Sequence, residues 1–555
     1  RPASGSGSPL SFVTMQMSGN DREFDIIIVG AGSAGCVLAN RLSARSDLNV
    51  LLIEAGDKDN WIWYKVPIGY LFAIGNLRSD WMFQTTPQPG LGGRSLAYPR
   101  GKTLGGSSAI NAMISMRGQK EDYEGWKAAG LTDWGWHDVL PTFRRIEDHF
   151  LGDSDHHGTG GEWRVEEPRL RWPVLDAVRD AAEEMGIPKS PDFNTGDNEG
   201  SGYFHVNQKR GLRWSTATGF LKPVMSRPNL QVETNICVES LIIDEGRVTG
   251  LVGSRDGVSL NFKARASVVL SAGSIGSVQI LQRSGIGPGK RLQEAGIWPL
   301  VDQQLIGANL QDHLQQRAIY KVQNTRTLNE TYHSVFGKAK MALDYALFRK
   351  GPLTMAPSQV GIFTRSDPSQ TRANLQFHMQ PLSLDKFGDP LHRFPAITAS
   401  ACNLQPTSRG EVYIKSPSPE DAPHISPNYL STEEDRLVAA NAIRVTRQLM
   451  SQPALAPYAP EEVLPGATVG DSQAGLERAA GDIGTTIFHP VGTIAMGGTS
   501  DFESPLDQRF RVRGVEGLRV IDASAMPRIT SGNTNTPTIM MADRGAEMLL
   551  EDLKA

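Results

Sequence analysis

One histidine near the C-terminal end is well suited to acid–base chemistry. His489 stands in the run F-H-P-V-G-T-I-A-M-G, among apolar and small residues. Burying an imidazole costs free energy unless its polar atoms find partners, so this position needs a reason. Because an imidazole has a pKa of about 6.5, it can accept a proton at neutral pH and act as a general base. The alternative for any such histidine is a structural bond to a backbone carbonyl in the core.

Three glycines near the N-terminal end indicate a second chemistry, the binding of a dinucleotide. Gly30, Gly32 and Gly35 form the pattern G-x-G-x-x-G directly after the β-branched run D-I-I-I-V. In such a pattern the first glycine permits a tight turn, the second lets a pyrophosphate approach the backbone, and the third lets helix and strand pack closely. Glu54 ends the next strand-like run and lies 22 residues after Gly32. This is the spacing of a carboxylate that binds ribose hydroxyls.

The stretch 100–111, R-G-K-T-L-G-G-S-S-A-I-N, adds a loop rich in backbone N–H groups and hydroxyls. Such a loop can wrap the second part of a large cofactor. A nicotinamide enzyme does not need it, so the loop favours FAD over NAD. The alternative is a turn of small residues before a helix.

Length and composition indicate the number of domains and the class of protein that carries these motifs. The 555 residues exceed what one hydrophobic core usually serves, so we expect two or three domains. A hydrophobic share of 39% and a charged share of 21% are typical of a soluble globular protein. The net charge of −4 gives no reason to expect nucleic acid as a partner. No apolar run is long enough to predict a transmembrane segment.

The cysteines and the remaining histidines do not indicate a metal site. Cys36, Cys237 and Cys402 are far apart and odd in number, which argues against a disulfide framework and against a thiolate site. This usage favours a reducing compartment, so we expect a cytoplasmic protein and leave peripheral contact with a membrane open. His156 and His157 are adjacent, but no third ligand follows at a fixed spacing.

Several further stretches resemble the signatures of the glucose-methanol-choline (GMC) family of FAD-dependent oxidoreductases. They are residues 101–118, S-A-G-S-I-G-S-V-Q-I-L-Q-R-S-G-I-G at 271–287, G-A-N-L-Q-D-H at 307–313, H-P-V-G-T at 489–493, and D-A-S-A-M-P…T-S-G-N-T-N-T-P-T at 522–538. With the N-terminal glycines they extend from about residue 24 to residue 548, nearly the whole chain.

The resemblance implies FAD as the cofactor and a set of residues that bind it. These are Gly30, Gly32, Ser33, Gly35, Glu54, Ala55, Leu104, Gly106, Ser107, Asn111, Ile114, Val238, Asp522, Ala523, Asn533 and Thr534. Some members of the family attach the flavin covalently through a histidine in the glycine–serine loop. Because Ile110 stands at that place, noncovalent FAD is implied.

The resemblance also implies a reaction. It places His489 and Asn533 on the substrate side of the flavin, where a primary alcohol would be oxidised to an aldehyde. The hydride would pass to flavin N5, and His489 would act as general base. Electrons would go on to oxygen or to a quinone-type acceptor. We expect Asp312 and His313 to have structural roles at the edge of the FAD domain.

The substrate is expected to be a neutral alcohol. Choline oxidases carry a glutamate that faces the quaternary ammonium, whereas Gln359 occupies the corresponding place here. An amide cannot neutralise a buried cation. Gln359 and His378 are the expected substrate contacts. Two alternatives stay open: a non-oxidative member of the same fold, such as a lyase or a light-driven decarboxylase, and a flavin-bound protein that serves only as a scaffold.

The fold class expected is α/β in a mixed α+β arrangement, with a Rossmann-like FAD-binding domain and a discontinuous substrate domain on an antiparallel sheet. We assign 22–170, 223–316 and 487–555 to the FAD-binding domain, 171–222 and 317–486 to the substrate-binding domain, and 1–21 to a disordered tail or a cloning remnant. Strands are predicted at 374–379 and 397–404, a hairpin at 230–233 and 238–243, and helices at 433–450, 472–480 and 537–553.

Overall fold

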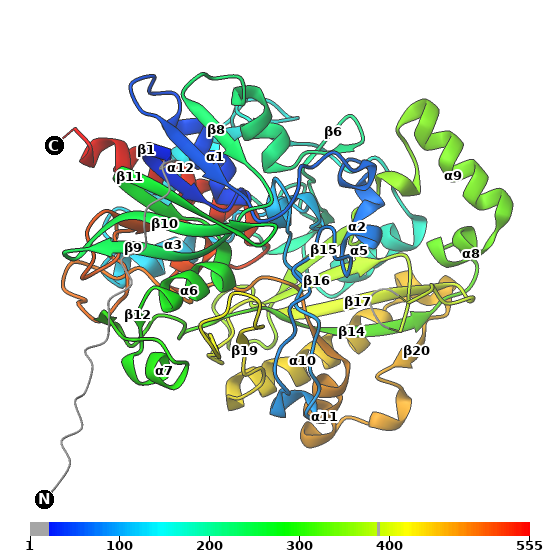
Figure 1. Ribbon diagram of the computed structural model, residues 1–555. Coiled ribbons are helices and arrows are strands. Elements are labelled where there is room, and N and C mark those ends of the chain that lie inside the picture. Colours follow the sequence, from blue (N-terminus) through cyan, green and yellow to red (C-terminus); the bar gives the residue numbers. More distant parts are fainter. Residues whose placement is uncertain (1–21, 386–388, 555) are drawn as a thin grey trace, which may run out of the picture.

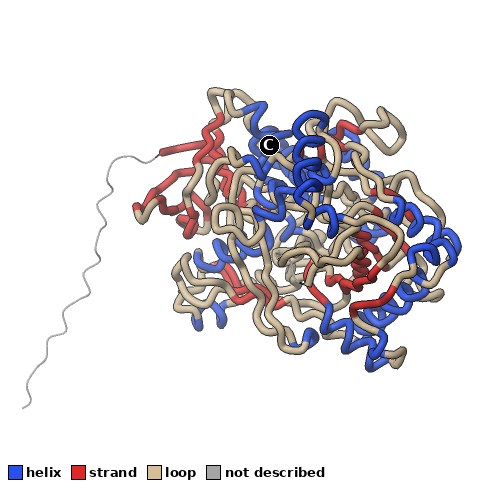
Figure 2. Tube along the Cα trace, turned by 90° about the vertical axis from the view of Figure 1, so that its right-hand side faces the viewer, coloured by secondary structure: helices blue, strands red, loops and turns tan. Residues whose placement is uncertain are grey.

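The computed structural model describes residues 22–385 and 389–554. The predicted tail, residues 1–21, lies outside the described residues. Two sheets organise the chain and lie in different parts of the molecule, as Figures 1 and 2 show from two directions.

The first sheet carries the nucleotide motif. Its strands follow the order β8 (Leu230–Glu233), β2 (Val50–Ile53), β1 (Arg22–Val29), β11 (Val258–Leu270), β10 (Arg247–Arg255) and β9 (Cys237–Asp244), and β22 (Leu518–Val520) pairs with β11. The pairs around β1 are parallel. A strand in the middle of a parallel sheet is covered on both faces, and the run Ile26–Val29 is fully apolar and buried.

The predicted hairpin at 230–233 and 238–243 is wrong. β8 runs parallel to β2, and β9 instead pairs with β10 at the opposite end of the sheet. The residues between β8 and β9 explain the difference, because Asn235 N donates to Gly56 O and Ile236 N donates to Glu54 O. The link is therefore tied to the end of β2 and does not form a turn between two neighbours.

Helices cover the first sheet and begin where its strands end. α1 (Ser33–Leu42) follows β1, α6 (Gly273–Arg283) follows β11, and α12 (Asn535–Asp552) packs along α1. Figure 1 shows α1 and α12 side by side although one lies near each end of the chain. The predicted C-terminal helix is confirmed as α12.

The second sheet is antiparallel throughout. Its strands follow the order β20 (Glu461–Leu464), β14 (Leu314–Lys321), β17 (Ala396–Asn403), β16 (Leu375–Gln380), β15 (Val360–Thr364) and β5 (Gly200–Tyr203), and β21 (Gly484–Thr486) pairs with β14. The strands expected at 374–379 and 397–404 are confirmed as the neighbours β16 and β17. The helices expected at 433–450 and 472–480 are confirmed as α10 (Glu433–Met450) and α11 (Gln473–Ile483).

The two faces of the second sheet differ in polarity. The alternate residues Ala318, Tyr320, Phe377 and Ala399 belong to an apolar core with α5 (Pro173–Glu184) and α10. The positions between them are largely polar and face the other way, as period-two alternation requires. This polar face turns toward the functional site.

The remaining α-helices and strands of the described residues lie around these two sheets. They are α2 (Tyr70–Ala73), α3 (Lys120–Ala128), α4 (Trp136–Ile146), α7 (Gly289–Glu294), α8 (Leu328–His333), α9 (Val335–Phe348), β3 (Glu147–His149), β4 (Trp163–Val165), β6 (Gln208–Lys209), β7 (Leu212–Arg213), β12 (Ile286–Gly287), β13 (Val301–Asp302), β18 (Glu411–Tyr413) and β19 (His424–Ser426). Among the helices of the described residues, none is both long and apolar enough to cross a membrane.

The mixed fold class with two sheets is confirmed. The expected domain boundaries remain a prediction. The boundary set between 316 and 317 falls inside β14, so this strand as a whole belongs with the second sheet.

Candidate active site

A cavity of about 1810 Å³ is lined by residues from both sheets. This volume exceeds the roughly 300–1,000 Å³ of a site for one small ligand, so it has room for a dinucleotide and a substrate together. Most of the predicted site residues line it: Gly30, Gly32, Ser33, Glu54, Ala55, Gly106, Ser107, Asn111, Ile114, Val238, His378, His489, Asp522, Ala523, Asn533 and Thr534.

Three predicted residues lie outside the cavity lining: Gly35, Leu104 and Gln359. Gly35 serves packing, because a Cβ there would stand 1.8 Å from Gly30 O. Leu104 is part of the apolar core of the first sheet. Gln359 is buried beside β15, and its Nε2 donates to Ala356 O at 2.9 Å.

Two helix N-termini face the nucleotide half of the cavity. α1 begins after Gly32 and α12 begins after Thr534, and neither has a side-chain cap. The hydroxyl of Ser33 donates to Asn535 Oδ1 at 2.6 Å and joins the two helix starts, while Asn535 Nδ2 has no partner among the residues that the structure describes. Free N–H groups and the positive ends of two helix dipoles suit anionic groups such as phosphates.

Glycine is required where the nucleotide turn meets its neighbours. Gly30 has φ +97°, and a Cβ there would stand 2.6 Å from Ser271 O. The 101–111 loop packs onto the same turn, because a Cβ at Gly106 would stand 2.6 Å from the Cα of Gly32. Gly32 itself has almost open space on its Cβ side. The open side at Gly32 fits the close approach of a pyrophosphate.

Glu54 is a buried carboxylate at the end of β2. Its two oxygens accept hydrogen bonds from Ala31 N and Gly56 N, each at 2.8 Å. Burial raises the pKa of Glu54 to about 7, in spite of these bonds. A carboxylate has about four acceptor positions, so Glu54 keeps capacity for ribose hydroxyls. Together with the helix starts and the glycines, these donors and acceptors fit FAD.

His489 lies at the centre of a chain of hydrogen bonds. Its Nε2 lies 3.1 Å from Nδ2 of Asn533, and its Nδ1 lies 3.0 Å from Nδ1 of His313. The far nitrogen of His313, Nε2, lies 3.1 Å from the backbone oxygen of Leu404. The carbonyl can only accept, so His313 Nε2 carries a proton and its Nδ1 accepts the proton of His489 Nδ1. The Nε2 atom of His489 is therefore unprotonated and accepts from Asn533 Nδ2, and both residues line the cavity.

A buried carboxylate holds the backbone of this histidine. Asp312 Oδ1 accepts from His489 N at 2.7 Å, and its Oδ2 accepts from the hydroxyls of Tyr98, Tyr429 and Thr486. Burial raises the pKa of Asp312, and these hydrogen bonds act against the rise.

Electrostatics keeps His489 neutral. Burial lowers its pKa well below the ordinary value of 6.5, and His313, His378 and Arg100 lower it further. Burial also lowers the pKa of His313 to about 4. Both rings are therefore uncharged at neutral pH, as the hydrogen-bond chain requires.

The sequence predicts only structural roles for Asp312 and His313. In the structure both residues contact His489. The link depends on the pairing of β14 with β21, which brings residues 312–314 next to 486–489. These segments are more than 170 residues apart. No local pattern in the sequence indicates this pairing.

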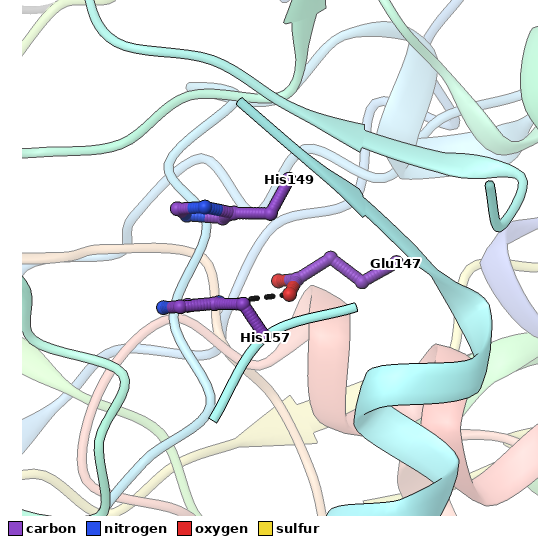
Figure 3. Close-up of side chains that lie close together, drawn as sticks. All are labelled: Glu147, His149 and His157. Carbon is purple, nitrogen blue, oxygen red and sulfur yellow. Dashed lines mark hydrogen bonds and ion pairs between the residues drawn. The ribbon is translucent and has the colours of Figure 1, made fainter. Parts of the chain in front are cut away.

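Glu147, His149 and His157 lie close together outside the cavity (Figure 3). His157 Nδ1 lies 2.8 Å from Glu147 Oε2, and His157 Nε2 lies 2.7 Å from Asp192 Oδ2. Arg117 Nη2 also donates to Glu147 at 2.7 Å. Since both nitrogens of His157 are bonded to carboxylates and an arginine touches the cluster, the arrangement is an ion-pair network that disfavours a metal cation.

The chain is similar to known oxidoreductases over most of its length. Models of the GMC oxidoreductase family match residues 24–315 and 406–542. An alcohol dehydrogenase [acceptor] of Pseudomonas putida is 39% identical over 95% of this chain and 96% of its own length. An oxygen-dependent choline dehydrogenase of Vibrio vulnificus is 37% identical over 95% of this chain and 94% of its own length.

Solved structures show the same fold. Pyridoxine 4-oxidase from Mesorbium loti superposes with a TM-score of 0.86 and 31% identity, over 94% of this chain and 98% of that one. A formate oxidase at 24% identity, with a TM-score of 0.89 over 97% of this chain and 100% of that one, supports the fold alone. The chain therefore belongs to the GMC family of FAD-dependent oxidoreductases.

Proposed function

We propose that the protein oxidises a primary alcohol to an aldehyde, with His489 as the general base. The observation that carries the proposal is the hydrogen-bond chain from Leu404 through His313 to His489, which assigns the Nδ1 proton of His489 and leaves its Nε2 unprotonated in a residue that lines the cavity. The similarity to an alcohol dehydrogenase supports the substrate class.

Oxidation of an alcohol removes a proton from oxygen and a hydride from carbon. Bound FAD supplies the acceptor for the hydride. His489 Nε2 takes the hydroxyl proton, a role that is typically worth about 10²- to 10⁴-fold in rate. Asn533 Nδ2 can donate to the substrate oxygen, while its Oδ1 has no partner within the described part of the chain and can accept a hydrogen bond. The two side chains thus hold the hydroxyl group and receive its proton.

We propose noncovalent FAD held by the residues predicted from the sequence. Ile110 has no nucleophilic atom and packs in a small apolar cluster with Tyr64 and Ala73. Denaturing the purified protein in acid should therefore release all yellow colour into the supernatant. Colour that stays with the precipitate would contradict noncovalent attachment.

An alcohol panel tests the proposed reaction. Anaerobic mixing of the FAD-loaded enzyme with primary alcohols should bleach the flavin absorbance, whereas a lyase, a decarboxylase or a scaffold would leave it unchanged. His489→Ala should keep its FAD and lose at least ~10²-fold in the bleaching rate. Near-normal bleaching by this variant would remove His489 from the mechanism. Oxygen and quinone-type acceptors, both proposed, are separated by an oxygen electrode run beside a quinone-dye assay.

We further propose a cytoplasmic protein that contacts a membrane surface through α9. The three cysteines of the chain are unpaired, which suits a reducing compartment. Five apolar residues of α9 are exposed, with Phe336 at 89%: Val335, Phe336, Leu343, Leu347 and Phe348. The same helix and its end carry Lys338, Lys340, Arg349 and Lys350 against one acid, Asp344. Exposed apolar and basic side chains on one helix suit an anionic bilayer surface.

The position of α9 agrees with this proposal. Figure 1 shows α9 at the outer edge of the molecule. Lys338, Met341 and Ala342 of the same helix line the cavity. A substrate with an apolar body at the bilayer surface would thus meet the cavity at the surface that touches the membrane.

A further inference from the structure

Arg317 places a positive charge in the substrate half of the cavity. It lies on β14, where Gln315, Arg317 and Ile319 line the cavity and the alternate residues belong to the apolar core. The side chain of Arg317 therefore points to the cavity side of the sheet, as the two-residue alternation along a strand requires. The cavity wall opposite the nucleotide site is built by this polar face of the second sheet.

The guanidinium group of Arg317 has no ion-pair or hydrogen-bond partner among the described residues. Burial lowers its pKa, and no carboxylate acts against this. Two buried arginines of the fold are paired with carboxylates, Arg117 with Glu147 at 2.7 Å and Arg519 with Asp552 at 2.5 Å, and the buried Arg213 is hydrogen-bonded to Asn111 Oδ1. Arg317 is only partly exposed, and an unpaired cation with limited access to water is costly unless a partner arrives. Arg317 is therefore placed to receive an anion.

Two neighbours in the same row of the sheet also have unpaired polar atoms. Arg317 is opposite Ser400 on β17, and Ser400 is opposite His378 on β16. The hydroxyl of Ser400 and both ring nitrogens of His378 are buried without a protein partner among the described residues. Burial lowers the pKa of His378 to about 3, so its ring is neutral and carries one N–H. Each of the three side chains can donate a hydrogen bond.

The chemistry of this row favours a carboxylate. A guanidinium presents a planar fork of N–H donors that matches the two oxygens of a carboxylate. The same charge repels a quaternary ammonium, which agrees with the expectation from Gln359 that the substrate is not choline. The unpaired His378 adds a donor that can reach a second acceptor of the ligand.

The anion site is separate from the reacting atoms. His378 is among the groups that lower the pKa of His489, whereas Arg317 is not. Arg317 and His378 are two strand spacings apart, which is about 10 Å between their Cα atoms. The carboxylate and the reacting hydroxyl therefore belong at different ends of one substrate.

We propose that Arg317 forms a carboxylate subsite, and that the preferred substrates are hydroxy acids whose carboxylate is remote from the carbinol carbon. This inference rests on the proposed alcohol oxidation. A hydroxymethyl aromatic acid or an ω-hydroxy acid meets both requirements, since its two polar ends are held apart by an apolar body.

A matched pair of alcohols tests the subsite. The FAD-loaded enzyme should oxidise 4-(hydroxymethyl)benzoate with a kcat/KM at least ~10-fold above that for 4-methylbenzyl alcohol. Arg317→Met keeps the length of the side chain without its charge, and it should abolish this preference mainly through KM. The neutral alcohol should change less than ~2-fold, and Arg317→Lys should restore only part of the preference.

Binding of a non-oxidisable acid gives a readout independent of turnover. Calorimetry should detect 4-methylbenzoate binding to the FAD-loaded wild type and a loss of at least ~10-fold in affinity in Arg317→Met. Equal kcat/KM for the two alcohols, or equal binding of 4-methylbenzoate by wild type and variant, would overturn the subsite. If neither alcohol bleaches the flavin, the proposed oxidation fails, and the calorimetry then decides the subsite by itself.

Discussion

The Nδ1 atoms of His313 and His489 lie 3.0 Å apart in a buried site, and one proton is shared between them. The carbonyl of Leu404 determines which ring carries this proton, because the carbonyl can only accept and therefore requires a proton on His313 Nε2. His489 therefore carries its proton on Nδ1, and its Nε2 lone pair accepts from Asn533 Nδ2 until a substrate hydroxyl takes that place. A residue more than 170 positions away in the sequence thus prepares the proposed base for its role.

Removing this acceptor should impair the proposed base without touching the substrate. In His313→Leu, the Nδ1–H of His489 loses its partner and the ring loses its preferred tautomer. We expect kcat to fall by ~10- to 100-fold, as for other partners that orient a functional imidazole, while KM changes little. His313→Asn, which is close in size to leucine but places an oxygen near the lost Nδ1, should recover most of the rate.

The FAD content of both variants serves as the control. Equal losses in His313→Leu and His313→Asn, with FAD retained, would mean that His313 acts through packing and not through its acceptor.

The pH dependence of flavin reduction follows from the lowered pKa of His489. A general base works in its unprotonated form, and burial with the nearby His313, His378 and Arg100 lowers the pKa of this ring. The kcat/KM for a neutral alcohol should therefore stay level as the pH is lowered through 6.5, the ordinary value, and fall only below it. Rapid mixing over a pH series measures this, with circular dichroism as a check on folding. An acid limb at 6.5 or above would contradict the assignment.

The sequence predicts the nucleotide half of the site better than the substrate half. Gly30, Gly32 and Glu54 lie in one strand–turn–helix–strand unit, so their spacing along the chain reflects their arrangement in space. The His313–His489 pair depends on β14 pairing with β21, a contact between distant segments. The row that contains Arg317 could not be predicted for the same reason, because only the register of three strands places Ser400 and His378 beside Arg317.

The wrong hairpin at 230–243 has a similar cause. Two strand-like runs separated by four residues look like neighbours in a sheet. The backbone bonds of Asn235 and Ile236 to the end of β2 are tertiary, and they send the chain to the other end of the sheet.

The buried network around Glu147 should contribute to stability in a defined pH range. Glu147→Gln leaves Arg117 without its carboxylate, and we expect a loss of ~3–5 kcal/mol in the free energy of unfolding. Urea titration measures it. Glu167→Gln, which breaks the exposed pair with Arg171, should cost no more than ~1 kcal/mol and serves as the control.

The two ends of that range follow from opposite pKa shifts. Burial would raise the pKa of Glu147, but Arg117 and His157 outweigh it and lower the pKa, so its contribution is lost as the pH falls below 4.5. Burial would lower the pKa of His157, but Asp192 and Glu147 outweigh it and raise the pKa, so its contribution fades as the pH rises above 6.5. The difference between wild type and Glu147→Gln should be largest between 4.5 and 6.5. A difference that grows steadily above 6.5 would contradict this account.

Vesicle binding tests the contact proposed for α9. The purified protein should sediment with vesicles that contain phosphatidylglycerol, bind weakly to pure phosphatidylcholine, and be released by salt, because the basic side chains are screened. Phe336→Asp should reduce binding by ~10-fold or more, since it removes an exposed apolar side chain and adds a negative charge. Phe502→Asp makes the same change at a phenylalanine outside α9 that is 77% exposed, and it should leave binding unchanged. If both variants lose binding alike, the contact is general charge attraction and α9 is not the membrane surface.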